Sequence, residues 1–583
     1  MTIMKIKSYI ISASALLALA SCSDQMDYHE YKVDGADYIK EMFSRVGGFT
    51  TTIYQQLDQD FGNYSGAMLS SATDESVYSH PGNQIEDFYN GAWSPTNAKS
   101  SIWSSCYKGI SYCNLLLDEF QGLTFPDYQL DIEYKKEMQQ YENYQWEARW
   151  ARAYFYFLLV RQYGDVPLKV ENMDATKANS LPRTSSDEIF QFIDNECAAI
   201  KDNIMKDYGT LGLGVAETGR ANDLAVLALR ARAALYYASP LFNPENDKER
   251  WHQAALRCKE AIDACKLRGM GLTSDYASLF QSDNYKDTKE QIFIRRQNST
   301  SANNNYEKYN FPVGMENGGG GNCPTQNLVD AFEMTNGKAI NEEGSGYDPQ
   351  NPYANRDKRL GWIVAVNGEQ WPNSNPTLLE TFEGGANGPQ LTNGTPTGYY
   401  LKKYCNPTTI IGAKGANAFY HNYVIFRLGE LYLDYAEALL NWKGDGYTTD
   451  SEFSMSAAAA INIVRARAGQ PDLATGLSLA DFTKKYENER FVELAFEGHR
   501  FFDVRRWKKA PEYFTTIKTM KITGTKQVID NGDGTTSVQY DCTYTPQVDN
   551  KTRNTWNDKM YFFPIPQSEI QKSGGALKQN PGW

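Results

Sequence analysis

Residues 146–167, WEARWARAYFYFLLVRQYGDVP, contain the strongest secondary-structure signal in the chain. Apolar and aromatic residues recur at helical spacing and predict a helix from Gln145 to Tyr163. Gly164 stands just past the end of this helix and Pro167 follows, which is the order expected where a helix stops. The stretch therefore favours a fold that is built mainly from α-helices.

Helical periodicity extends to both sides of this stretch. Alanines recur every three or four positions in Ala221–Ser239, so a neighbouring helix can approach closely, and Trp251–Lys266 is the helix expected to pair with it. Such helix hairpins resemble tetratricopeptide repeats, although the strict 34-residue consensus is absent. The other expected helices are Tyr38–Leu57, Ile102–Phe120, Thr184–Asp202, Asn422–Trp442 and Met455–Ala468. A further helix is expected to start near Ser478, where Ser478 and Asp481 match a capping box, and to run through ENERFVELAFEGHRFFDVRRW.

Two regions interrupt the helical pattern. Residues 58–100 and 267–415 are rich in Gly, Asn, Ser and aromatic residues, and the segment NSTSANNNYEKYNFPVGMENGGGGN is too polar to bury itself. Residues 519–545 alternate around a DNGDGT turn at 530–535, which predicts a β-hairpin. We therefore expect a mainly α fold, with a helix-hairpin scaffold, large irregular insertions and a few short β-hairpins.

The N-terminus has the features of an export signal. Lys5 and Lys7 precede an apolar run, Ile10–Ala20, which is too short for a comfortable membrane span of about 20 residues. The run ends in Leu-Ala-Ser-Cys at 19–22, which resembles the lipobox of bacterial lipoproteins and predicts lipidation of Cys22. We expect residues 1–21 to be removed and residues 23–40 to form an exposed tether.

Composition limits the possible partners. Removal of residues 1–21, which contain two lysines and no acid, takes the net charge from −13 to −15. So acidic a chain is a poor candidate for nucleic acid, whose phosphates require Lys and Arg. The chain has 39 Tyr, 27 Phe and 11 Trp, more rings than a core alone explains, and tyrosines suit wet, amphipathic surfaces.

The cysteines and histidines predict neither disulfides nor a metal site. Cys106 and Cys113 are seven positions apart on an expected helix, as are Cys258 and Cys265, and two helical turns are too far for a disulfide. We interpret these cysteines as small buried residues. No two of the five His have the i, i+4 spacing of a metal pair, and no cofactor is expected.

One carboxylate pair could support catalysis. Glu493 and Glu497 lie four residues apart on one helix face, and paired carboxylates are what a glycosidase uses, with His499 and Asp503 as a further base and its partner. The structural alternative is stronger, because nearby guanidinium groups would lower the pKa of these acids, the wrong direction for a general acid. The neighbouring arginines are Arg490, Arg500, Arg505 and Arg506. We therefore predict no catalytic residues.

Two polar motifs also have structural explanations. Arg356, Asp357 and Arg359 could capture a carboxylate or phosphate, but a salt-bridged turn that locks a loop to the scaffold is the preferred interpretation. The DNGDGT segment lacks the spacing and the downstream Glu of a calcium loop, so a hairpin turn is expected there.

Aromatic rings in the irregular regions are the candidates for ligand binding. Sugars present apolar faces that stack on flat rings and hydroxyl rims that need polar partners. Trp93 and Trp371 are the first choices, because neither follows a helical apolar pattern. For each ring the alternative is an anchor that fixes its own loop. The remaining candidates are Tyr78, Tyr306, Tyr309, Trp362 and Asn97, together with Tyr89, Phe311 and Phe382.

Several ordered segments resemble the SusD/RagB family of outer-membrane nutrient-binding lipoproteins. They are WEARWARAYFYFLLVRQYGDVPL, NLVDAFEMTNGKAI, NPYANRDKRL, YVIFRLGELYLDYAEALLN, INIVRARAG, ERFVELAFEGHRFFDVRRW, FFPIPQSEI and LKQNPGW, which occur in family order behind the lipobox. The resemblance spans nearly the whole mature chain. It implies one domain at 22–583, with a helical part at 22–266, an irregular ligand face at 267–415 and a C-terminal part at 416–583.

The resemblance also implies a function. A lipid anchor would hold the protein on the outer membrane, facing the exterior, where it would bind a glycan without cleaving it. The partner would be a SusC-like TonB-dependent transporter, which the protein would cap as a lid. Three alternatives remain open: the same architecture with a peptide ligand near Arg295 and Arg296, a surface glycosidase that uses Glu493 and Glu497, and a pure helical-repeat scaffold.

Overall fold

The structure is a computed structural model that describes residues 35–211, 219–281, 289–297, 302–375, 377–549, 553 and 556–583. Cys22 and most of the expected tether lie outside these residues. The tether prediction is wrong at residues 36–40, which form the short helix α3 (Ala36–Lys40). Within the described ranges, no helix combines the length and the hydrophobicity that crossing a membrane requires.

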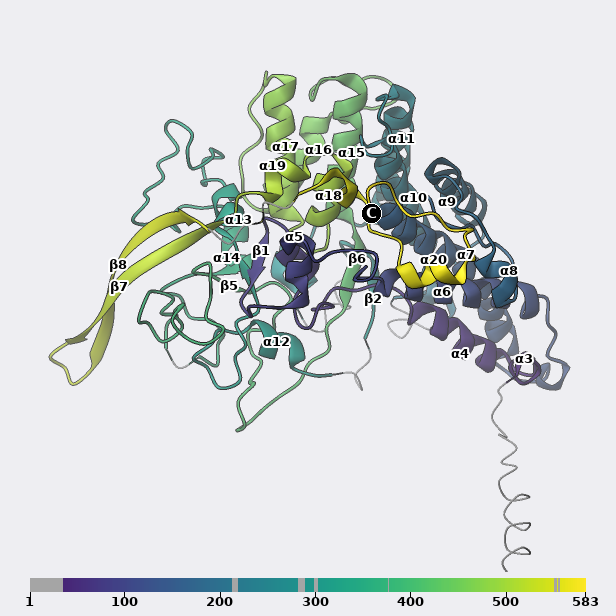
Figure 1. Ribbon diagram of the computed structural model, residues 1–583, viewed down its shortest axis with the longest axis horizontal. Coiled ribbons are helices and arrows are strands. Elements are labelled where there is room, and N and C mark those ends of the chain that lie inside the picture. The colour runs from purple at the N-terminus through teal and green to yellow at the C-terminus, as the bar shows by residue number, and fades with distance from the viewer. Residues whose placement is uncertain are drawn as a thin grey trace, which may run out of the picture.

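A continuous row of packed helices forms the scaffold (Figure 1). From α6 to α17, each helix of the row packs against the next, and α4 packs against both α6 and α7. The expected mainly helical fold is therefore confirmed. The row consists of α4 (Phe43–Tyr54), α6 (Ser101–Glu119), α7 (Tyr134–Tyr163), α9 (Ser186–Ile200), α10 (Asp223–Ala238), α11 (Lys248–Leu267), α15 (Leu428–Lys443), α16 (Ala457–Arg467) and α17 (Leu479–Glu493).

Small residues allow these helices to approach closely. Gly109 on α6 faces Phe155 on α7, and a methyl group at Gly109 would lie 2.4 Å from the phenyl ring. Ala225 and Ala228 of α10 are fully buried, and the indole N–H of Trp150 on α7 donates to the Ala225 carbonyl oxygen at 3.2 Å. The alanine spacing of α10 thus has the packing role that its sequence predicts.

Two expected helices have different structures. The first residues of Asn422–Trp442 form strand β6 (Tyr423–Arg427), which pairs antiparallel with β2 (Gln291–Arg295), because Tyr, Val, Ile and Phe favour strands. The helix from Ser478 is interrupted after Glu493, and α18 (Arg500–Arg506) follows a turn with positive φ at Phe496 and Gly498. The cap is confirmed in part, because the Ser478 side chain accepts from the Asp481 N–H.

The remaining elements are short, and many of them lie in the irregular regions. β1 (Ser76–Tyr78) pairs with β3 (Asn322–Pro324), and β4 (Val364–Ala365) pairs with β5 (Tyr400–Leu401). The short helices are α5 (Asp87–Asn90), α8 (Ala175–Asn179), α12 (Asn305–Asn310), α13 (Gln326–Ala331), α14 (Lys358–Ile363), α19 (Ala510–Phe514) and α20 (Gln567–Lys572). The 3₁₀ turns are η1 (Leu69–Ala72), η2 (Gln84–Glu86), η3 (Pro126–Tyr128), η4 (Tyr208–Leu211), η6 (Tyr276–Leu279) and η9 (Asp558–Tyr561).

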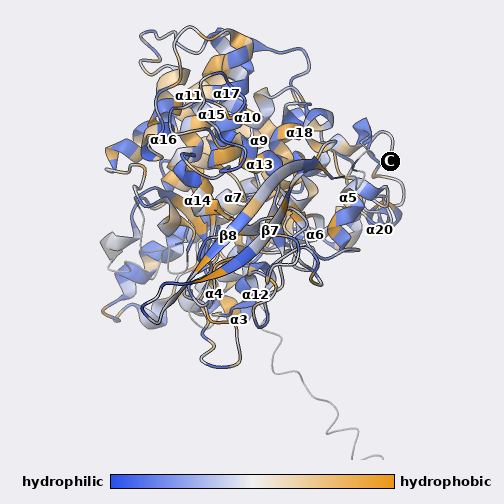
Figure 2. Ribbon diagram, turned by 90° about the vertical axis from the view of Figure 1, so that its left-hand side faces the viewer, coloured by the Kyte–Doolittle hydropathy of each residue, from blue (hydrophilic) through white to orange (hydrophobic). Residues whose placement is uncertain are grey.

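A long hairpin confirms the prediction for residues 519–545. Strands β7 (Lys518–Asp530) and β8 (Thr536–Val548) pair in continuous antiparallel register and project from the body of the molecule (Figure 1). Figure 2 views the molecule from the side toward which the hairpin projects and shows it crossing in front of the helices. The cysteines are also as expected: the eight in the described residues are free, and all except Cys542 are buried.

Candidate aromatic ligand surface

The pairing of β1 with β3 brings two distant irregular segments together. Tyr78 lies opposite Asn322, and the Ser79 N–H donates to the Gly321 carbonyl oxygen at 2.9 Å. One ring nitrogen of His80, Nε2, lies 2.7 Å from the Gly319 carbonyl oxygen. Helix α12, which carries Tyr309, ends just before this segment. The pairing therefore places the first irregular region beside the middle one.

Tyr78, His80 and Tyr309 form an aromatic cluster at this junction. The Tyr78 and His80 rings stack at a centroid distance of 4.9 Å. Gly66 lies against both tyrosines, because a methyl group there would be 2.3 Å from the Tyr78 hydroxyl oxygen and 3.2 Å from the Tyr309 ring. Tyr78 is buried, whereas Tyr309 is 42% exposed. Tyr309 is therefore the ring of the cluster that is open to a ligand.

Polar side chains surround this cluster. The Gln84 amide donates to the Ser65 hydroxyl at 2.8 Å, and the Asn83 amide donates to the Ser65 carbonyl oxygen at 3.2 Å. The Tyr78 hydroxyl, whose pKa burial raises to about 12, is neutral and donates to the Ser65 carbonyl oxygen at 3.4 Å. A flat ring beside neutral donors and acceptors suits a sugar. We call Ser65, Tyr78, His80, Asn83, Gln84 and Tyr309 the Tyr309 surface.

The two first-choice tryptophans are buried. Trp93 is 4% exposed and packs edge-on against Phe563, at 4.7 Å between centroids, and against Trp583, at 5.1 Å. Trp371 is 7% exposed and lies near Phe311, with the Lys402 ammonium 5.5 Å from its ring. Neither ring is open to a ligand, so the prediction that they form exposed platforms is wrong. Their large apolar area serves the core instead.

The remaining predicted residues also divide by exposure. Tyr306 is buried between Phe61 and His421, and its hydroxyl donates to the Lys403 carbonyl oxygen. Phe311 and Phe382 are buried as well. Trp362, Asn97 and Tyr89 are partly exposed, so their role in ligand binding stays a prediction. The Trp362 ring stacks on Tyr276 at 5.5 Å between centroids. The Asn97 amide donates to Asp87 at 2.9 Å, and the Arg553 guanidinium lies 4.4 Å from the centre of the Tyr89 ring.

Sequence reasoning missed four residues of the Tyr309 surface, Ser65, His80, Asn83 and Gln84. A usable signal was the spacing of Tyr78 and His80, because residues i and i+2 of an extended segment lie on the same side. The Asn83 and Gln84 amides reach this surface only because η2 lies beside Ser65. No local sequence pattern predicts that placement.

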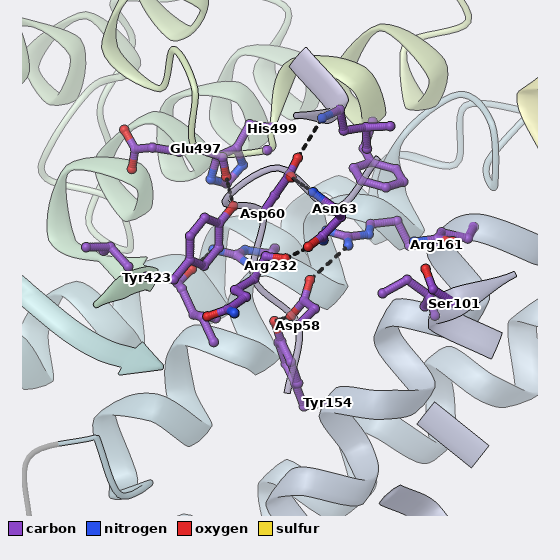
Figure 3. A pocket seen from close by; sticks show the side chains of 18 of the residues that line it. Asp58, Asp60, Asn63, Ser101, Tyr154, Arg161, Arg232, Tyr423, Glu497 and His499 are labelled. Carbon is purple, nitrogen blue, oxygen red and sulfur yellow. Dashed lines mark hydrogen bonds and ion pairs between the residues drawn. The ribbon is translucent and has the colours of Figure 1, made fainter. Parts of the chain in front are cut away.

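A second polar site is too small for a sugar (Figure 3). It lies where residues 58–64 meet α7, α10 and β6, and its cavity measures about 60 Å³, room for a few water molecules only. Asp58 accepts a 2.5 Å hydrogen bond from Tyr154. Burial raises the pKa of Asp60 to about 6, although three backbone N–H groups donate to its carboxylate. We regard this site as a structural junction.

The carboxylate pair on α17 and the following turn is buried in an ion-pair network. Glu493 contacts Arg427 at 2.7 Å and Arg359 at 2.9 Å, and it also pairs with Arg467. Glu497 contacts Arg427 and Lys403, both at 2.7 Å. Burial alone would raise the pKa of each carboxyl, but the cations outweigh burial and lower both pKa values. These contacts favour the structural interpretation, and a lowered pKa is the wrong direction for a general acid.

The arginines named from the sequence have other partners. Arg490 and Arg506 pair with Asp503, at 2.7 and 2.9 Å, and Arg500 pairs with Asp74 at 2.7 Å. Arg505 lies 3.4 Å from the centre of the Phe501 ring. Burial lowers the pKa of His499 well below its ordinary value, so this residue is neutral. The prediction that these four arginines neutralise the carboxylate pair is therefore wrong.

The NPYANRDKRL turn locks the irregular region to the scaffold, as the sequence predicts. Arg356 donates to the backbone carbonyl oxygens of Pro352 and Phe332. Arg359 reaches Asp357 at 2.7 Å and Glu489 of α17 at 2.5 Å. Both guanidinium groups are occupied and buried, so this motif has a structural role.

Comparisons with known proteins identify the class. The model of the SusD family matches residues 279–583, and a model described as "Starch-binding associating with outer membrane" matches residues 22–235. The chain belongs to the SusD family. A SusD-like protein of Bacteroides fragilis has a similar structure, with 26% identity, a TM-score of 0.72 and coverage of 94% of this chain and 98% of that chain.

Two more distant relatives match over most of their length. SusD-like protein P2 of Formosa agariphila is 23% identical over 460 residues, which cover 75% of this chain and 73% of that protein. A laminarin-binding SusD-like protein shares the fold, with a TM-score of 0.60, 22% identity and coverage of 93% and 99%.

Proposed function

We propose that this protein binds a glycan at the outer membrane and delivers it, uncleaved, to a SusC-like TonB-dependent transporter. The membership of the SusD family, the starch-binding family model and the laminarin-binding relative support a carbohydrate ligand. The observation that carries the proposal is the Tyr309 surface, where an exposed ring stands beside neutral hydrogen-bonding groups. Cys22 would supply the lipid anchor on the outer face of the membrane.

The Tyr309 surface would bind a sugar through complementary contacts. The exposed ring covers one apolar sugar face, while Asn83, Gln84 and the Ser65 hydroxyl face the hydroxyl rim. None of these groups is an acid or a base suited to glycoside hydrolysis. Glu493 and Glu497, the pair with helical spacing for that reaction, are buried and ion-paired, so we propose binding without cleavage.

The test removes the exposed ring and compares it with a matched tyrosine. Tyr309→Ala should weaken binding to the best polysaccharide of a panel by at least about tenfold, equivalent to about 1.4 kcal/mol, in affinity electrophoresis or calorimetry. Tyr38→Ala, which removes a ring of similar exposure (45%) from α3, should leave binding unchanged. If Tyr309→Ala and His80→Ala both bind like the wild type, the Tyr309 surface is not the ligand site.

The same binding assays with a set of peptides test the peptide alternative. Arg295, considered for a peptide carboxylate, already donates to the Gln55 carbonyl oxygen at 3.1 Å. Binding of peptides and of no polysaccharide would reject the proposal. Delivery to a transporter is tested separately, by co-purification of the full chain with the barrel from outer membranes.

A further inference from the structure

A second pocket lies on a different part of the molecule. It measures about 290 Å³ and is formed by α6, residues 167–169, α8 and α20. In Figure 1, α6, α8 and α20 are on the right, away from α12, the helix that carries Tyr309. We call it the Lys169 pocket, and its lining includes Ser104, Ser111, Lys169, Asn179, Leu181 and Leu577.

Lys169 is a buried cation without a counter-ion. The residue is 7% exposed, and its ammonium donates one hydrogen bond, to the Ser111 hydroxyl at 3.1 Å. Among the residues that the structure describes, none places a carboxylate within 4.0 Å of it. Lys403, a similarly buried lysine, instead donates to Glu497, to Tyr276 and to a carbonyl oxygen. Burial lowers the pKa of Lys169, as expected for a poorly compensated charge.

The backbone holds Lys169 in this place. Its N–H donates to the Tyr156 hydroxyl at 2.6 Å, and its carbonyl oxygen accepts from Tyr156 and from the Asn114 amide. The segment is thus fixed against α6 and α7. The ammonium reaches the Ser111 hydroxyl of α6, and both residues line the pocket.

The rest of the lining suits a polar ligand with a single negative charge. Glu569 and Lys572 form a 2.7 Å pair with each other, so Lys169 supplies the one uncompensated charge of the described lining. The Ser104 hydroxyl and the Asn179 amide have no hydrogen-bond partner within the described ranges. Leu181 and Leu577 add apolar surface.

We propose that the Lys169 pocket binds one acidic sugar unit, whose carboxylate or sulfate ester lies on the Lys169 ammonium. A volume of 290 Å³ is at the lower end of ligand pockets, about 300–1,000 Å³, which fits one unit better than a chain. Ser104 and Asn179 then contact the sugar hydroxyls. This site is separate from the Tyr309 surface, so either can fail without the other.

Calorimetry with three probes tests the proposal. D-glucuronate, D-glucose 6-sulfate and D-glucose are titrated into the wild type, and at least one anionic probe should bind at least about tenfold more tightly than glucose. The stronger of the two anionic probes identifies the charged group. Lys169→Met should remove this preference, while the double variant Glu569→Gln, Lys572→Met, which removes both members of the neutral pair, should change affinity less than about threefold.

Two measurements distinguish failure of the Lys169 pocket from failure of the Tyr309 surface. Tyr309→Ala should still bind the anionic probe, and Lys169→Met should still bind the polysaccharide. Lys169→Met should also have the melting temperature of the wild type, which would show that the variant is folded. Equal binding of glucose and both anions by the wild type would overturn the proposal without any variant. Unchanged anion binding by folded Lys169→Met would also overturn it.

Discussion

Two adjacent buried carboxyl groups, Asp74 and Glu75, should respond in opposite ways to neutralisation. Asp74 accepts two hydrogen bonds from Arg500, at 2.9 and 2.7 Å. Glu75, which is also buried, accepts one from the Phe496 N–H at 2.8 Å and has no ion-pair partner among the described residues. Burial raises the pKa of Glu75 from 4.5 to about 8. The pair thus provides a mutation and its matched control at consecutive positions.

The direction of the pH effect on stability follows from the number of protons bound by the folded and unfolded states. Between pH 4.5 and about 8 the folded protein keeps a proton on Glu75 that the unfolded chain releases, so stability falls as pH rises through this window. Above pH 8, this difference between the unfolded and folded pKa values lowers the free energy of unfolding by about 5 kcal/mol. Glu75→Gln keeps the acceptor for Phe496 and removes the ionisation, so it should match the wild type near pH 4.5 and exceed it by about 5 kcal/mol at pH 9. Asp74→Asn breaks a buried ion pair and should lose about 3–5 kcal/mol.

Calorimetric melting at pH 5 and pH 9 measures both effects. For a chain of this length, 5 kcal/mol corresponds to a change in Tm of about 4 °C. Glu75→Gln should raise Tm at pH 9 and change it little at pH 5, whereas Asp74→Asn should lower Tm at both. If Glu75→Gln lowers Tm at pH 9 as much as Asp74→Asn does, the folded protein stabilises the ionised Glu75 carboxylate, which contradicts a raised pKa.

Three other changes test the scaffold by thermal and chemical denaturation. Gly109→Ala should destabilise by about 1–3 kcal/mol because its methyl group meets Phe155, whereas Gly361→Ala, a helical glycine with open space around it, should stabilise by up to about 1 kcal/mol. Arg359→Met should cost about 3–5 kcal/mol, because three buried carboxylates lose a shared partner, and a cost below 1 kcal/mol would contradict that role. Glu493→Gln should be destabilised by a similar amount. An assay for reducing sugars should detect no sugar released by either the wild type or this variant, and release by the wild type alone would support the glycosidase hypothesis.

The sequence predicted the helical scaffold well where periodicity and end signals agree. Helix α7 ends at Tyr163, before Gly164, as expected, but it begins at Tyr134, because the polar residues before Gln145 hide its periodicity. The strand at Tyr423–Arg427 was mistaken for helix, since a short apolar run next to a helix fits both periods. Pairing with β2, more than 100 residues away, decides between them.

The ligand surface was less predictable, for a physical reason. A tryptophan in a polar, glycine-rich loop has the same sequence surroundings whether its ring faces solvent or the core. Trp93 is buried because Phe563 and Trp583, at the other end of the chain, pack against it. Tyr309 lies in the last turn of α12, beside Gly66 of the first irregular region, and is 42% exposed. Exposure of a loop ring depends on such distant contacts.

The ion-pair network constrains the order in which the chain can fold. Arg359 and Lys403, in the middle of the chain, have distant carboxylate partners: Arg359 pairs with Glu489 and Glu493, 130 and 134 residues later, and Lys403 pairs with Glu497, 94 residues later. Until those residues arrive, Arg359 has only the local partner Asp357, and Lys403 lacks Glu497, so burial of the two cations is costly. Helix α17 and the turn after it thus complete the region around Arg359, and a chain that ends before them would leave that region open to proteases.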